Sequence, residues 1–267
     1  AIAAFSDFTS TRDLLRLSDW APKQWRMDQK PAVQRFKDQI DAAVVARRDT
    51  NQGQTHDVIG RLLNPTGAIC PDIAQLRGTI LSYYYAGRKT TALSIVWALY
   101  LLATDPQAQS RVRAEAQALG PDTAAPALPF TKAVIDEALR LYPPLGAMPR
   151  RATQAVRVGD LHIRKGDSVL MPLYILHRHA NLWETPHAFQ PDRFWGNTKP
   201  PAYTYLPFGG GPRFCPGAIF ATQLAAYAVA RFVRDFTFAL PPDWRPEPTF
   251  LLTLRLKGGV KLQVTPC

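Results

Sequence analysis

The longest apolar stretch of the sequence covers residues 71–104 and is followed by Pro106. The spacing of its apolar residues predicts one continuous helix, which at about 1.5 Å per residue would be roughly 45–50 Å long and would cross a whole domain. Arg77, Arg88 and Lys89 interrupt the stretch, so we interpret it as the central buried helix of a globular protein rather than as a membrane span. The rest of the fold is expected to be built around this helix.

Shorter segments also carry apolar residues at helical spacing. The predicted helices cover residues 31–48, 58–63, 107–119, 130–141 and 218–234. Residues 1–30 are expected to form short helices and a connecting loop.

Two regions alternate in the way that β-strands do. Residues 147–176 predict strands with hairpin turns at Gly159-Asp160 and at Lys165-Gly166-Asp167. Residues 249–264 predict a closing hairpin around Lys257-Gly258-Gly259. The expected fold class is therefore mainly α with small β-sheets (α+β).

The composition narrows the class of protein. A chain of 267 residues with 46% hydrophobic and 20% charged residues is typical of a soluble globular protein, without stable membrane insertion. Its three cysteines, Cys70, Cys215 and Cys267, fit neither a disulfide framework nor a zinc site and indicate a reducing, cytoplasmic compartment. The net charge of +11 is spread along the chain, which favours an acidic protein partner over nucleic acid.

One cysteine lies in a loop of unusual composition, Phe-Gly-Gly-Gly-Pro-Arg-Phe-Cys-Pro-Gly over residues 208–217. Its glycines allow backbone to pass close to a flat ligand, and Pro216 suits the first turn of the helix that follows. The N-terminal amides of that helix would favour a Cys215 thiolate, and Arg213 would supply a positive charge for a ligand carboxylate. Alternatively, Cys215 is a small buried apolar residue in a surface turn.

The loop matches the pattern F-x-x-G-x-R-x-C-x-G at Phe208, Gly211, Arg213, Cys215 and Gly217. This pattern resembles the haem-binding signature of the cytochrome P450 family, in which the cysteine thiolate is the axial iron ligand. The resemblance implies that Cys215 binds the iron of haem b, iron protoporphyrin IX.

The middle of the long helix, Ala86-Gly87-Arg88-Lys89-Thr90-Thr91, resembles the family's distal helix pattern A-G-x-(D/E)-T-(T/S). The resemblance implies that Ala86 and Gly87 face a planar ligand and that Thr90 offers it a hydroxyl. Read alone, the segment would be a helix kink with a threonine bonded to its own helix. Lys89 stands in place of the usual carboxylate, so another water path, or peroxide as the oxidant, becomes more plausible than the usual proton relay.

Three charged residues resemble another family element, the E-x-x-R motif and its third member. They are Glu137, Arg140 and, in the segment Phe189–Phe194, Arg193. The resemblance implies a buried Glu–Arg–Arg network that locks the loop carrying Cys215. Without that context, Glu137 and Arg140 would be an ordinary surface ion pair of little energetic consequence.

The resemblance also assigns further residues around the haem. It implies that Arg213 and Arg151 bind the propionates, that Phe208 covers the sulfur side, and that Gly209 and Gly217 also belong to the cofactor-binding site. His177-Arg178 resembles the family's His-Arg element, and we expect a structural role for His177 rather than a ligand role. Candidate substrate contacts, which are equally ordinary core residues, cover 145–148 and 250–252.

The function implied by the resemblance is a haem-dependent monooxygenase that inserts one oxygen atom of O2 into a C–H bond of a small, largely apolar substrate. Electrons would come from a ferredoxin or another redox partner, expected to dock near Arg111, Arg113 and Lys132. Whole family members are longer, so the chain is expected to be a single haem-thiolate domain over residues 1–267 that lacks the N-terminal portion of the fold.

Three alternatives stay open at this point. The chain is a truncated haem-binding or electron-transfer module without oxygenase activity, a peroxide-driven haem-thiolate peroxygenase, or a helical scaffold that binds no haem.

Overall fold

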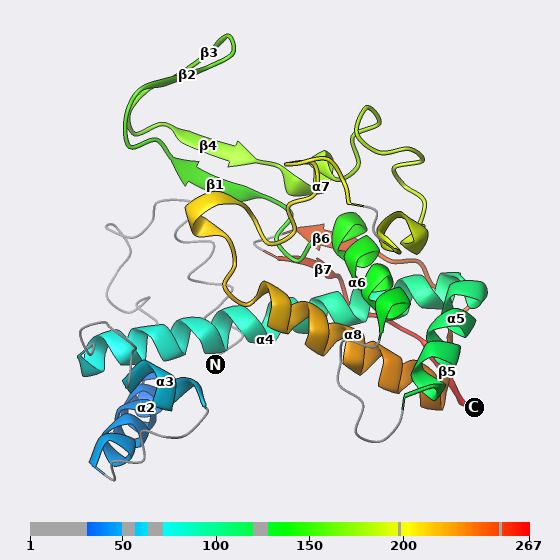
Figure 1. Ribbon diagram of the computed structural model, residues 1–267, viewed down its shortest axis with the longest axis horizontal. Coiled ribbons are helices and arrows are strands. Elements are labelled where there is room, and N and C mark those ends of the chain that lie inside the picture. Colours follow the sequence, from blue (N-terminus) through cyan, green and yellow to red (C-terminus); the bar gives the residue numbers. More distant parts are fainter. Residues whose placement is uncertain (1–30, 50–56, 64–71, 120–127, 197–198, 251–252) are drawn as a thin grey trace. The chain divides into compact units, whose positions relative to one another are not determined.

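The computed structural model describes residues 31–49, 57–63, 72–119, 128–196, 199–250 and 253–267. The described chain consists of helices and four two-stranded antiparallel sheets (Figure 1). Residues 1–88 and residues 89–267 form two compact units. The short helices predicted over residues 1–30 lie outside the described residues. Within the described ranges, no helix combines the length and the apolar character that crossing a membrane requires.

The first unit contains α2 (Pro31–Asp49), α3 (Val58–Leu63) and the first part of α4 (Ile73–Thr104). The helices predicted over residues 31–48 and 58–63 are thus confirmed. Ile40, Val44 and Leu76 form the buried centre of this unit, because the apolar stripe of α2 meets the start of α4.

Helix α4 extends over 32 residues and is continuous through the boundary between the two units. This confirms the long helix predicted from the apolar stretch. Its end is set by Asp105, whose carboxylate accepts a hydrogen bond from the Ala108 N–H at 2.9 Å and so caps α5 (Pro106–Gln117). Pro106 occupies the first turn of α5, where a missing N–H is not needed.

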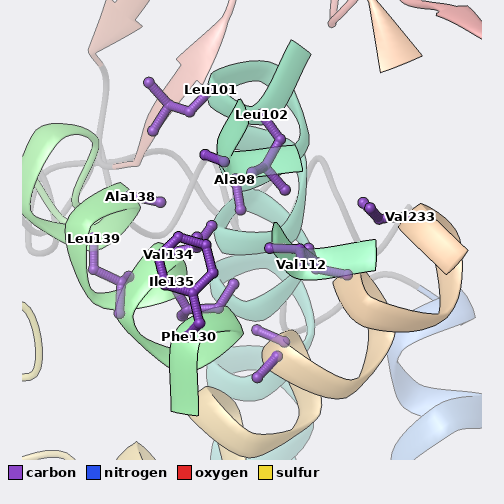
Figure 2. Close-up of a cluster of buried hydrophobic side chains, with 14 of the residues drawn as sticks. Ala98, Leu101, Leu102, Val112, Phe130, Val134, Ile135, Ala138, Leu139 and Val233 are labelled. Carbon is purple, nitrogen blue, oxygen red and sulfur yellow. The ribbon is translucent and has the colours of Figure 1, made fainter. Parts of the chain in front are cut away.

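The core of the second unit lies among the last turns of α4, α5, α6 (Pro129–Leu141) and α8 (Ala218–Asp235). Figure 2 shows α6 directing its apolar side chains at α4, with Val112 of α5 and Val233 of α8 beside them. The buried cluster includes Ala98, Leu102, Val112, Phe130, Val134, Ile135, Leu139, Val229 and Val233. The helices predicted over residues 107–119, 130–141 and 218–234 are confirmed to within two residues at each end.

Gln109 ties a strand to this helical core. Its side-chain amide donates to the backbone oxygens of Leu102 and Phe238, at 3.0 and 2.9 Å, and its Oε1 accepts the Phe238 N–H at 2.8 Å. Phe238 lies in β5 (Phe236–Ala239), directly after α8. The buried amide therefore holds α4, α5 and β5 together.

The predicted hairpin at Gly159-Asp160 is confirmed: β2 (Val156–Val158) pairs with β3 (Leu161–Ile163). The turn at Lys165-Gly166-Asp167 exists, but the prediction that it joins two paired strands is wrong. β4 (Ser168–Met171), which follows that turn, pairs instead with β1 (Met148–Arg151). The β2–β3 hairpin is thus inserted between the two strands of the longer pair.

The end of the predicted strand region is helical. Residues Leu173–Leu176 form the short helix α7, in which Leu173 is fully buried. Two 3₁₀ turns follow, η4 (Pro191–Phe194) and η5 (Gly211–Arg213).

The predicted closing hairpin around Lys257-Gly258-Gly259 is also wrong. β7 (Leu254–Leu256) pairs with β6 (Pro248–Phe250), whereas β8 (Gln263–Pro266) pairs with β5. The reason is tertiary: β5 leaves α8 with Phe238 buried in the helical core, and β8 joins β5 rather than returning to β7. Turn residues alone do not specify such a distant partner.

Candidate functional site

The loop before α8 is organised by its own backbone. The Cys215 N–H donates to the Phe208 oxygen at 3.0 Å, and the Gly209 N–H donates to the Leu206 oxygen at 3.0 Å. Between them, η5 turns the chain back, and α8 begins three residues after the cysteine. Cys215 is half-buried and carries a free thiol at the start of this helix. The cysteine therefore lies two residues before Gly217, the N-cap of α8.

Gly209 is required by its surroundings. Its φ is +77°, in the left-handed region, and a Cβ at this position would lie 3.2 Å from the Met148 Sδ. A Cβ at Gly217 would lie 3.9 Å from the Cys215 Sγ. The loop thus approaches β1 closely on one side, and Gly217 keeps the space beside the sulfur open on the other.

The two arginines assigned to haem propionates, Arg151 and Arg213, are both exposed. Among the described residues, neither side chain has a hydrogen bond or a carboxylate partner, in contrast to the Arg150 side chain, which donates to the Pro149 oxygen. Each guanidinium group could pair with one carboxylate of a ligand, and a cysteine thiolate is one of the ligands that haem iron takes in proteins. The residues present therefore fit haem.

The structure brings Glu137, Arg140 and Arg193 together. Glu137 and Arg140 are fully buried and form a bidentate pair, with Nε–Oε2 and Nη2–Oε1 distances of 2.7 and 2.8 Å. The Arg193 Nε lies 3.5 Å from the Glu137 Oε1, and its Nη2 donates to the Thr185 Oγ1 at 2.7 Å. Because α6 places Glu137 and Arg140 one turn apart, both side chains reach the same segment.

The remaining hydrogen bonds of this network go to backbone groups. Arg140 donates to the oxygens of His177, Pro186 and Ala188 at 2.7–3.0 Å. The Gln190 N–H donates to the Glu137 Oε1 at 2.9 Å. The ion pair is therefore fully satisfied and clamps the irregular segment between α7 and η4, as a buried charge pair requires.

His177 is fully buried beside this network. Its Nε2 accepts a hydrogen bond from the Leu206 N–H at 2.9 Å. Burial, followed by the charge of Arg140, lowers the pKa of His177 to about 4. The imidazole is therefore neutral near pH 7.

We expect this histidine to make the folded protein less stable in acid. Its pKa is about 4 when folded and 6.5 when exposed, so between these values the unfolded chain binds more protons. The free energy of unfolding should then fall by roughly 3 kcal/mol as the pH drops from 6.5 to 4. Urea unfolding across this range should show a flatter pH dependence for His177→Gln than for the control, His162→Gln at an exposed position. Equal slopes for the two variants would contradict the assignment.

The residues assigned to the distal helix all lie on α4, without a kink that interrupts it. Ala86 and Gly87 are exposed and belong to the first unit, whereas Thr90 is half-buried and belongs to the second. The Thr90 oxygen accepts a hydrogen bond from the Ser94 Oγ at 3.0 Å. Small side chains and a hydroxyl thus follow one another on a regular helix.

A mainly apolar cavity of about 500 Å³ lies beside the cysteine loop, between α6 and α8. Its lining includes Lys132, Asp136, Tyr205, Phe208, Gly209, Phe214, Ile219 and Gln223. A salt bridge of 2.5 Å between Lys132 and Asp136 supplies its charge. The residues predicted to contact substrate do not line this cavity.

Two of the predicted substrate-contacting segments lie together elsewhere. A Cβ at Gly146 would be only 2.6 Å from the Phe250 ring, and the Leu254 N–H donates to the Pro144 oxygen at 2.9 Å. The β6–β7 hairpin therefore packs against the segment that leads into β1. Leu251 and Leu252 lie outside the described residues.

Sequence reasoning missed the hydrogen bond between His177 and Leu206 and the contact between Met148 and Gly209. The first joins a side chain to a backbone N–H 29 residues away, and no motif encodes it. Only the positive φ of Gly209 has a sequence signal, because glycine is the residue that adopts it most readily.

Comparison with known proteins agrees with this geometry. The cytochrome P450 family profile matches residues 2–264. A cytokinin hydroxylase of Arabidopsis thaliana is 33% identical over 219 residues, which cover 79% of this chain and 43% of that protein. Cytochrome P450 4A14 of Rattus norvegicus is 36% identical over 196 residues, covering 71% of this chain and 39% of the relative.

The crystal structure of the cytochrome P450DA heme domain matches the fold with a TM-score of 0.82 and 25% sequence identity. The match covers 98% of this chain and 59% of that domain. The chain spans about half the length of the curated relatives that it matches. It is mainly helical with small sheets, and it belongs to the cytochrome P450 family.

Proposed function

We propose that this protein is a haem-thiolate monooxygenase that inserts one oxygen atom of O2 into a C–H bond of a small, largely apolar organic substrate. The observation that carries the proposal is the half-buried Cys215 thiol at the start of α8, on a loop held by the Cys215–Phe208 hydrogen bond. Members of the P450 family are typically monooxygenases, and the cytokinin hydroxylase among the relatives carries this type of activity in its name.

Different residues of the site would bind different parts of the cofactor. Cys215 would hold the iron, and Arg213 and Arg151 would bind the two propionates as exposed cations without carboxylate partners. Phe208 would cover the sulfur side and limit the access of water and oxidants to it. Bound in this way, haem b supplies the activation of dioxygen, and its thiolate ligand favours O–O cleavage.

By the family resemblance, residues of α4 would orient the substrate and supply a proton. Ala86 and Gly87 leave room for a planar ligand against the helix, and the Thr90 hydroxyl would be the hydrogen-bond donor and proton source on this helix. Lys89 gives this helix a cation where its relatives' pattern has an acid. That substitution favours a second candidate function, a peroxygenase that uses hydrogen peroxide and needs no electron donor.

An external electron donor is expected for the monooxygenase, and two observations bear on where we propose that it docks. Arg111 pairs with Asp192 at 2.8 Å and stacks on Phe130, and Arg113 donates to the Val233 and Phe236 oxygens. These contacts give both arginines a structural role. Lys132 also pairs with a carboxylate, Asp136 of its own helix, but its side chain is 60% exposed beside the cysteine loop, so we favour it for docking an acidic ferredoxin.

Reversing the charge of Lys132 should therefore slow reduction by an acidic ferredoxin and weaken its dependence on salt. Lys132→Glu also removes the cation beside Asp136, which adds to the negative charge at this place. Because salt screens exposed charges, we expect the reduction rate to fall several-fold at low ionic strength and only slightly at high ionic strength. Stopped-flow reduction checks this, with Lys257→Glu as the control because Lys257 also pairs with a carboxylate, Glu247, and both side chains are largely exposed. Equal rates and salt slopes for the two variants would rule out docking at Lys132.

The proposed function is tested by adding haemin to the purified chain, reducing it, and recording the spectrum of the carbon-monoxide complex. We expect the red-shifted absorption band that marks a thiolate ligand. Turnover of apolar substrates is then compared with ferredoxin, its reductase and NADPH, and with hydrogen peroxide alone. A protein that stays colourless would support the scaffold alternative, and a thiolate spectrum without turnover in either system would support a haem-binding module.

A further inference from the structure

His177 connects the buried ion pair to the loop that carries Cys215. It directly follows α7, and its side chain is fully buried. Its backbone oxygen accepts a hydrogen bond from the Arg140 Nη1 at 2.8 Å, and its Nε2 accepts the Leu206 N–H at 2.9 Å. One residue therefore contacts the charged network on one side and the beginning of the cysteine loop on the other.

The hydrogen bonds continue from Leu206 to the cysteine. The Leu206 oxygen accepts the Gly209 N–H at 3.0 Å, which closes a tight turn. The oxygen of Phe208, inside that turn, accepts the Cys215 N–H at 3.0 Å. Fixing the Leu206 N–H thus fixes one end of the turn on which the cysteine backbone rests.

The His177 imidazole accepts a hydrogen bond at Nε2, and this leaves its other ring nitrogen, Nδ1, without a partner among the described residues. Because Nε2 accepts a hydrogen bond, the neutral ring carries its proton on Nδ1. Among the described residues, this buried Nδ1 has no hydrogen-bond partner, and the ring lies against Tyr205 with centroids 5.6 Å apart. A buried unpaired N–H is unfavourable, so an apolar side chain would suit simple packing better. The contribution that offsets this cost is the acceptor at Nε2.

We propose that His177 is a positioning residue, which holds the Leu206 amide and, through it, places the cysteine loop for the thiolate ligand. Its effect on the ligand rests on the proposed haem-thiolate function. The hydrogen bond itself does not, and it is tested in the haem-free chain.

The experiment compares three variants of the full chain. His177→Phe keeps a ring of similar shape but removes the acceptor, His177→Gln offers Oε1 as a substitute, and His179→Phe is the control at an exposed position two residues away. In His177→Phe, exchange of the Leu206 amide hydrogen should accelerate about tenfold, as the loss of a typical hydrogen bond predicts. Exchange of the Val134 amide in the core of α6 should change much less, because the lost hydrogen bond is local to Leu206. A general loss of stability would instead accelerate exchange at both amides.

A second readout is the spectrum after haem is added. His177→Phe should show a larger fraction of carbon-monoxide complex without the thiolate band, and His177→Gln should restore the band. Equal Leu206 exchange in His177→Phe and His179→Phe would overturn the proposal. If the wild type itself shows no thiolate band, the proposed function fails, whereas the exchange result still decides the role of His177.

If His177→Phe does not fold, the unsubstituted protein answers the question. In the ¹⁵N-labelled chain, a through-bond coupling between the Leu206 amide nitrogen and the His177 Nε2 is expected across their hydrogen bond. The absence of this coupling in a well-resolved spectrum would overturn the proposal.

Discussion

Replacing Glu137 with alanine is expected to lower the free energy of unfolding by about 3–5 kcal/mol. The substitution leaves the Arg140 guanidinium fully buried without its carboxylate, which now lies 2.7 Å away. It also removes the acceptor for the Gln190 N–H and the charge that faces Arg193. The main cost is the stranded cation rather than the loss of the pair, because burying an unpaired charge is far more unfavourable than separating a solvated one.

Urea unfolding of the Glu137 variant is best compared with that of Glu247→Ala. Glu247 also pairs with a cation, Lys257 at 3.1 Å, but both side chains are largely exposed. An exposed pair contributes about 0.2–1 kcal/mol, so the control should hardly change. Replacing Glu137 and Arg140 together by methionine should recover part of the loss, because the fully buried Arg140 cation is removed as well and only Arg193 is left without its carboxylate. Similar losses for Glu137→Ala and Glu247→Ala would show that the buried network does not stabilise the fold.

The helices were predictable from the sequence because their signals are local. The apolar stripe of α8 and the capping by Asp105 before α5 depend on residues within a few turns of one another. Strand pairing depends on distant segments, so β8 was assigned to β7 although it pairs with β5, which precedes it by more than 20 residues. The tail was predicted wrongly for this reason, whereas the short β2–β3 hairpin was predicted correctly.

In the candidate site, too, local patterns were predictable from the sequence and contacts between distant residues were not. Glu137 and Arg140 were identified through a resemblance, since their spacing alone is equally common on helix surfaces, and only the structure shows that both are fully buried. The role of His177 was not predictable, because its partner is a backbone N–H and every residue except proline has one. Sequence patterns identify side chains that act on ligands more readily than side chains that hold backbone.

Replacing Cys215 with serine is expected to abolish the thiolate band of the carbon-monoxide complex and the oxidising activity that depends on it. The serine hydroxyl has nearly the same size, so the loop and the start of α8 should stay folded. Its oxygen, however, remains protonated under conditions in which the helix N-terminus and a metal ion would stabilise a thiolate. Loss of the band with an unchanged urea midpoint would therefore assign the sulfur a ligand role.

Cys267→Ser provides the matched control, since Cys267 is exposed and its sulfur lies 3.3 Å from the Thr237 hydroxyl. The same exchange of sulfur for oxygen should leave the spectrum unchanged there. The alternative for Cys215, a small apolar residue in a surface turn, predicts a different pattern: a modest loss of stability and no spectral change. If Cys215→Ser retains the band, the sulfur does not bind the iron, and the buried network, the loop and His177 then serve stability alone.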